Sequence, residues 1–189
     1  MRRNKIIYRI ALDSMMAALY FIMTYLSIRI GTNYHITIAS MMVILSSQLF
    51  GLPDALFITL LGEFLNQTLT YGIMVTTPLW LIPPLARVFV LSLFKRHYTK
   101  RNDSLINHIV IYFLAIVLAG LSTSILNTAV TFLDGYIIGY PVSFVLLTTV
   151  IRFSLNLLTS IVLGAVSLPI LKVLGKAIHK KEESEGEQV

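Results

Sequence analysis

Polar side chains recur at helical spacing in residues 62–72, which lie within an otherwise apolar part of the sequence. Glu63, Asn66, Gln67 and Thr70 occupy positions i, i+3, i+4 and i+7, so a helix would place all four on one face. A carboxylate and two carboxamides in apolar sequence need water, protein or a polar ligand as hydrogen-bond partners. The pattern therefore predicts a polar face suited to binding.

Two arginines lie in similarly apolar sequence further along the chain. Arg87 follows Pro83-Pro84, and Arg152 lies one helical turn before Asn156. Counted along the expected helices at about 1.5 Å per residue, both arginines and Glu63 reach the outer half of the bilayer. Glu63 could pair with one arginine as a purely structural tie between helices. The second arginine would still lack a counter-charge, which favours a site for an anionic ligand.

The predicted substrate-binding set combines these residues with one further amide and the single tryptophan. It consists of Glu63, Asn66, Gln67, Trp80, Arg87, Asn127, Arg152 and Asn156. Trp80 would supply an apolar wall, although aromatic residues at that depth also form interface belts. The chain has no cysteine and no pair of histidines at metal-ligand spacing, so no metal site is expected. Hydrolase motifs and a phosphate-binding loop are missing as well, and we expect no catalytic residue, no cofactor and no ATPase activity.

Composition places these residues in a membrane. Hydrophobic residues make up 56% of the sequence, and the mean hydropathy is +0.80. Six apolar segments, at about residues 6–28, 36–50, 53–71, 78–94, 106–133 and 142–174, predict six transmembrane helices. The expected fold is an all-α integral membrane protein with one six-helix bundle over residues 1–175. The polar segment 176–189 is expected to be a disordered cytoplasmic tail.

Basic residues mark one side of this bundle. They gather at the N-terminus, in residues 95–101 and in residues 176–181. Cytoplasmic flanks of membrane helices carry such an excess, which predicts a multi-pass membrane protein with both termini in the cytoplasm. The net charge of +6 then reflects topology, and no nucleic-acid partner is expected.

Two short motifs resemble a known family. Residues 11–19, Ala-Leu-Asp-Ser-Met-Met-Ala-Ala-Leu, and residues 49–55, Leu-Phe-Gly-Leu-Pro-Asp-Ala, are similar to segments of the substrate-binding S components of energy-coupling factor (ECF) vitamin transporters. The resemblance implies vitamin binding in the outer half of the bundle. It also implies a transmembrane coupling protein and two ATPase subunits as partners. Ser14 and Ala18 match the small residues through which the first helix contacts the coupling protein.

The identity of the vitamin follows less directly. Pantothenate, from one subgroup of the family, fits the arginines and amides best because it has a carboxylate, hydroxyl groups and an amide. Folate, riboflavin, pyridoxine and hydroxymethylpyrimidine are alternatives. Two other classes of function remain open from the residues alone. A solitary secondary transporter or channel for a small anionic metabolite would work without ATPase subunits, and an intramembrane enzyme would use Glu63 as a general acid or base.

Overall fold

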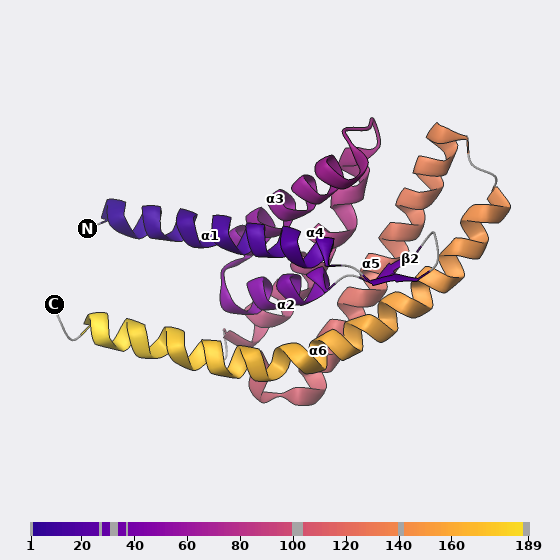
Figure 1. Ribbon diagram of the computed structural model, residues 1–189. Helices are drawn as coiled ribbons and strands as arrows, with labels where there is room; N and C mark the ends of the chain where they lie inside the picture. The colour runs from indigo at the N-terminus through magenta and orange to yellow at the C-terminus, as the bar shows by residue number, and fades with distance from the viewer. Residues whose placement is uncertain are drawn as a thin grey trace.

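The apolar segments of the sequence form the long helices of a computed structural model (Figure 1). The structure describes residues 2–26, 28–30, 34–36, 38–99, 104–139 and 142–186. Six α-helices lie in these ranges: α1 (Arg2–Tyr25), α2 (Ala39–Leu49), α3 (Leu52–Tyr71), α4 (Thr77–Thr99), α5 (Ile109–Ile138) and α6 (Val142–Gly186). A 3-10 turn, η1 (Leu105–Asn107), precedes α5. The predicted all-α bundle of six helices is thus confirmed.

The helices differ in how well they suit a bilayer. Four stretches are long and apolar enough to cross a membrane, namely Ile6–Tyr25, Thr77–Thr99, Ile109–Ile138 and Thr149–Gly175. α2 has only 11 residues, fewer than the roughly 20 that a full span requires. α3 has 20 residues, but Asp54 and the polar residues of segment 62–72 lower its hydropathy. The six predicted spans therefore correspond to six helices of unequal length and hydropathy.

A small β-hairpin separates α1 from α2, where the sequence predicts only a polar break. β1 (Ile28–Ile30) pairs antiparallel with β2 (Tyr34–Ile36), and Arg29 is opposite His35. Each strand alternates β-favouring side chains with a charged or polar residue, which is the pattern of a short strand. The first helix accordingly ends at Tyr25, earlier than the predicted boundary at residue 28. β2 lies against α6.

The core is formed where the helices approach closely. α3 packs on both α1 and α4, and α5 packs on both α4 and α6. Tyr112 of α5 is fully buried, and its hydroxyl donates to the carbonyl of Gly164 (3.2 Å) and lies 2.7 Å from the Ser167 Oγ of α6. This polar contact within apolar surroundings fixes α6 against the N-terminal part of α5.

Both ends of the chain lie on the same side of the bundle (Figure 1). The C-terminal end of α5 and the start of α6 lie at the opposite end from them (Figure 1). α6 is helical to Gly186, so the helix continues through most of the segment that the sequence predicts to be disordered. Lysine and glutamate are good helix formers, and a helix already nucleated in the bundle extends at low cost.

Candidate functional site

A polar cavity lies between the C-terminal half of α5 and the N-terminal half of α6. It encloses ≈ 240 Å³, including the part that opens to solvent. The lining comes from two helix faces: Ser124, Asn127, Thr128 and Thr131 of α5, and Thr149, Arg152, Phe153 and Asn156 of α6. On each helix these residues occupy positions i, i+3, i+4 and i+7, the spacing that gathers side chains on one face. Hydroxyl and amide groups here replace the leucines and isoleucines found elsewhere on both helices.

Arg152 gives this cavity its positive charge. Its Nη1 donates to the Thr131 Oγ1 across the cavity at 3.3 Å, a long hydrogen bond. In the part of the chain that the structure describes, no carboxylate forms an ion pair with Arg152. Asn127 lines the same cavity, and its side-chain amide makes no hydrogen bond to a described residue. A guanidinium and an amide are therefore both available to a ligand at this position.

Arg87 lies deeper and is held by neutral acceptors. Its side chain is 5% exposed, and the guanidinium comes from α4. Nε donates to the Thr123 Oγ1 (3.2 Å), and Nη2 donates to the Asn156 Oδ1 (2.7 Å) and the Ser160 Oγ (3.4 Å). Around it lie the apolar side chains of Ile44, Leu91, Ile116 and Ala119. Arg87 thus ties α4 to both helices that form the cavity.

Asn156 links the hydrogen bonds around Arg87 to the cavity that contains Arg152. Its Oδ1 accepts from Arg87, while its Nδ2 donates to the Gly120 carbonyl (3.1 Å) and the Ser124 Oγ (2.7 Å). Asn156 also lines the cavity that contains Arg152. It therefore forms the floor of the cavity and fixes the position of Arg87 beneath it.

Glu63 belongs to a separate network between α1 and α3. Its carboxylate accepts hydrogen bonds from the Tyr20 hydroxyl (2.9 Å), the Asn66 Nδ2 (3.1 Å) and the Gln67 Nε2 (2.8 Å). Thr70 extends the network by donating to the Asn66 Oδ1 (3.2 Å). The four residues expected on one helical face thus interact as a group. Tyr20 reaches them because it packs directly on Gly62, where there is no Cβ.

The ion pair considered from the sequence, Glu63 with Arg87 or Arg152, is not formed among the described residues. Glu63 has neutral donors from α1 and α3, and Arg87 has neutral acceptors from α5 and α6. Side-chain amides and hydroxyls satisfy each charge locally, so the charges need not approach each other. The structure consequently divides the predicted site into two networks rather than one.

The eight predicted residues are distributed over these networks. Asn127, Arg152 and Asn156 line the cavity, and Arg87 donates a hydrogen bond to Asn156 from beneath it. Glu63, Asn66 and Gln67 form the α1–α3 network. Trp80 is half-buried on α4 and does not belong to the cavity lining. Sequence reasoning missed Tyr20, Ser124, Thr128, Thr131, Thr149, Phe153 and Ser160. The polar stripe of α5 was the available signal, because Ser124, Asn127, Thr128 and Thr131 already have helical spacing in the sequence.

The remaining predicted contact residues lie on α1. Ser14 and Ala18 are exposed, one turn apart, and Ser14 donates its hydroxyl to the Ile10 carbonyl of its own helix (2.8 Å). This face of α1 is therefore available to a partner helix or to lipid. Among the described residues, no group of three or more histidine, aspartate or glutamate side chains is arranged to hold a metal ion.

Comparison with known proteins gives one family and one similar fold. A family model described as "ECF-type riboflavin transporter, S component" matches residues 4–176. No curated protein matches the chain. A solved structure, described as "Structure and mechanism of the S component of a bacterial ECF transporter", is similar with a TM-score of 0.59 and 18% sequence identity. The similarity covers 94% of this chain and 97% of that one, and at this identity it shows a shared fold.

Proposed function

The chain belongs to the family of ECF-type riboflavin transporter S components, and on that premise we propose that it binds riboflavin for uptake into the cell. The match to the family model over residues 4–176 carries this proposal. Pantothenate, which the arginines favour when the sequence is considered alone, has no support from the comparisons. The matching family is named for riboflavin transport, and riboflavin is one of the alternatives drawn from the sequence.

The cavity between α5 and α6 is the proposed binding site. Riboflavin combines a flat aromatic ring system, which carries carbonyl and nitrogen acceptors, with a chain of hydroxyl groups. Arg152 and Asn127 would donate hydrogen bonds to acceptors of the ligand, and Phe153 offers an aromatic surface to the ring. The threonine and serine hydroxyls suit the hydroxyl chain.

The size of the cavity indicates that binding requires movement. Pockets for ligands of this size have volumes of about 300–1,000 Å³, whereas the free volume inside this cavity is only ≈ 20 Å³. The outer ends of α5 and α6 would therefore separate to admit the ligand. Glu63, Asn66 and Gln67 lie in a different network, and we assign them the task of holding α1 against α3 beside the site.

The proposed partners follow from the family. A transmembrane coupling protein and two ATPase subunits would supply the energy for transport, since S components are the binding subunits of such importers. The exposed pair Ser14 and Ala18 would contact the coupling protein, because small side chains allow helices to approach closely in lipid. The proposed location is the plasma membrane of a prokaryote, with both termini in the cytoplasm.

Titration of riboflavin with the purified protein tests the proposal, because binding in a protein site changes the fluorescence of the flavin ring. We expect saturable binding of riboflavin and none of pantothenate. Arg152→Ala should weaken riboflavin binding about tenfold or more, because a hydrogen bond to a charged group contributes about 1.5–3 kcal/mol. Arg96→Ala is the matched control: Arg96 is exposed at the far end of α4, and its loss should leave binding unchanged.

The titration and two further assays decide between the alternatives. Binding of pantothenate in place of riboflavin would support the assignment of pantothenate that the arginines and amides favour in the sequence. Absence of any flavin binding would contradict the proposal. If vesicles containing this chain alone accumulated the ligand, it would instead be a solitary secondary transporter, and turnover of the ligand by the purified protein would indicate an enzyme.

A further inference from the structure

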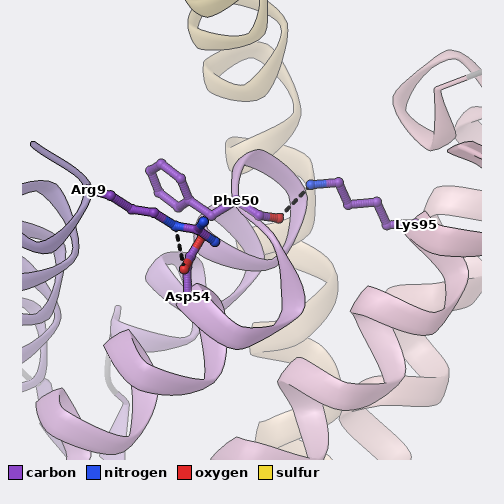
Figure 2. Close-up of polar contacts among 4 residues, drawn as sticks. All are labelled: Arg9, Phe50, Asp54 and Lys95. Carbon is purple, nitrogen blue, oxygen red and sulfur yellow. Dashed lines mark hydrogen bonds and ion pairs between the residues drawn. The ribbon is translucent and has the colours of Figure 1, made fainter. Parts of the chain in front are cut away.

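A charged contact ties α1 to the α2–α3 turn, by which we mean residues 50–54, including the first residues of α3 (Figure 2). Arg9 of α1 donates from Nε to the Asp54 Oδ1 at 2.8 Å and from Nη2 to the Asp54 Oδ2, so the pair is bidentate. It is the one salt bridge within the described ranges of the chain. Asp54 lies in the first turn of α3, where the helix N-terminus also stabilises a negative charge. Asp54 therefore does not depend on Arg9 alone.

The same turn is held from its other side by α4. The Lys95 Nζ donates to the carbonyl oxygen of Phe50 at 2.6 Å, directly after the last residue of α2 (Figure 2). A positive charge suits the C-terminal end of a helix, where carbonyl groups lack partners. The turn is thus bound independently by α1 and by α4, and release from α1 would leave the contact with α4 in place.

A second acceptor for Arg9 lies on α1 itself. Asp13 is one helical turn beyond Arg9, a spacing at which side chains of one helix meet. Asp13 is 7% exposed, and its Oδ1 is buried without a hydrogen-bond partner. Arg9 is within electrostatic reach of both Asp54 and Asp13. An unpaired buried carboxylate oxygen is costly, so a nearby guanidinium gains by turning to it.

Exchange between the two acceptors requires little rearrangement. The Arg9 side chain is 57% exposed, whereas that of Asp54 is 14% exposed. A long, exposed arginine side chain changes rotamer readily. We propose that Arg9 acts as a two-position clasp: bound to Asp54 it holds the N-terminal part of α1 against the α2–α3 turn, and bound to Asp13 it releases that part. The hydrogen bond from Tyr20 to Glu63 keeps the C-terminal part of α1 against α3 in both positions.

Release would change the angle of α1 while α2, α3 and α4 stay together. The exposed Ser14 and Ala18 face lies on this helix, and the α5–α6 cavity lies elsewhere in the bundle. The clasp would therefore regulate how α1 meets its partner without altering the ligand site. This last step rests on the proposed function, whereas the clasp itself does not.

Distance measurement on the purified chain tests the clasp. The sequence has no cysteine, so Ile7→Cys on α1 and Phe57→Cys on α3 provide two unique, exposed sites for spin labels. Pulsed electron paramagnetic resonance then gives the distribution of distances between them in lipid nanodiscs. Asp54→Asn should shift the distribution to longer distances, because Arg9 keeps only Asp13. Asp13→Asn should shift it to shorter distances, because Arg9 keeps only Asp54.

The decisive comparison uses Arg9→Gln. In that background Asp13→Asn should have no further effect, because Asp13 acts only through Arg9. An equal effect of Asp13→Asn with and without Arg9 would overturn the proposal, as would an unchanged distribution in Asp54→Asn. Asp134→Asn, which removes a carboxylate from α5, is the matched control and should leave the distances unaltered. If Asp13→Asn does not fold, Asp13→Ser removes the same charge.

This experiment needs neither a vitamin nor a coupling protein. Failure of the riboflavin titration would contradict the proposed function and leave the distance result standing. Failure of the distance comparison would contradict the clasp and leave the riboflavin result standing.

Discussion

A single asparagine side chain joins three helices around the buried guanidinium. Asn156 accepts a hydrogen bond from Arg87 of α4 and donates two to α5, while it belongs to α6. Only a carboxamide can accept from a cation and donate twice at once from one short side chain. This explains why a neutral residue, and not a carboxylate, is the partner of a charge inside the bundle.

Replacement of Asn156 by leucine should therefore destabilise the protein. The change removes the shortest hydrogen bond of a guanidinium that is 5% exposed. We expect the free energy of unfolding to fall by about 2 kcal/mol, the usual loss when a buried charged group loses a partner. Unfolding of the detergent-solubilised protein by increasing denaturant measures it.

Asn127→Leu is the matched control for that experiment. Asn127 lines the same cavity, but its amide makes no hydrogen bond to a described residue. Its replacement should leave the free energy of unfolding nearly unchanged and should weaken riboflavin binding instead. Equal destabilisation by the two substitutions would show that Asn156 has no special part in holding Arg87.

Two glycines determine how closely pairs of helices pack. A Cβ at Gly62 of α3 would lie 2.6 Å from the ring Cδ1 of Tyr20, and one at Gly164 of α6 would lie 2.5 Å from the Ile116 Cδ1. The distances are alike, but the obstacles differ. The buried ring of Tyr20 is held by its hydroxyl on Glu63, whereas the end of an isoleucine side chain can rotate away.

Gly62→Ala should consequently cost more stability than Gly164→Ala. Overpacking of a core that cannot adjust costs about 1–3 kcal/mol, and we expect Gly62→Ala to fall in that range. Gly164→Ala should cost less, because Ile116 can yield. Thermal unfolding of both variants, compared with the parent protein, measures the difference. A larger loss for Gly164→Ala would mean that Tyr20, and not Ile116, is the more adjustable neighbour.

Helix positions could be predicted from the sequence more completely than helix contacts. Runs of apolar residues located all six helices, because each helix alone must satisfy its backbone in a bilayer. The pairing of β1 with β2 was missed, since two three-residue strands leave only a weak pattern. The helical continuation of α6 to Gly186 was also missed, because its composition is that of a polar tail.

At the scale of the whole molecule, the sequence located the polar side chains inside the bundle but not how they are grouped. Helical spacing correctly placed Glu63, Asn66 and Gln67 on one face, and charge directed attention to Arg87 and Arg152. Which faces meet depends on the rotation of each helix about its axis, and spacing within one helix contains no information on that rotation. The separation of Glu63 from the arginines could therefore not be predicted, and neither could the pairing of α5 with α6 around a cavity.

Labelling of single cysteines tests the proposed orientation of the bundle. Val75, between α3 and α4, is 88% exposed, and Arg96 in the last turn of α4 is also exposed. The start of α3 contacts Arg9 near the N-terminus, and Lys95 contacts Phe50 next to it. Arg96 therefore lies on the N-terminal side, and Val75 lies at the other end of α3 and α4. A membrane-impermeant maleimide added to intact cells should label Val75→Cys. Arg96→Cys should react only after the cells are permeabilised. The reverse pattern would mean that the termini face outward.

The short α2 has a consequence for the electric field across the membrane. Its 11 residues span about 16 Å at 1.5 Å per residue, roughly half of the hydrocarbon thickness. The β-hairpin precedes it, and non-helical backbone at membrane depth needs protein or water as partners. Water in the half of the bilayer that α2 does not cross would make the insulating layer thinner at this place than in the surrounding bilayer, so the transmembrane voltage would fall over a shorter distance there.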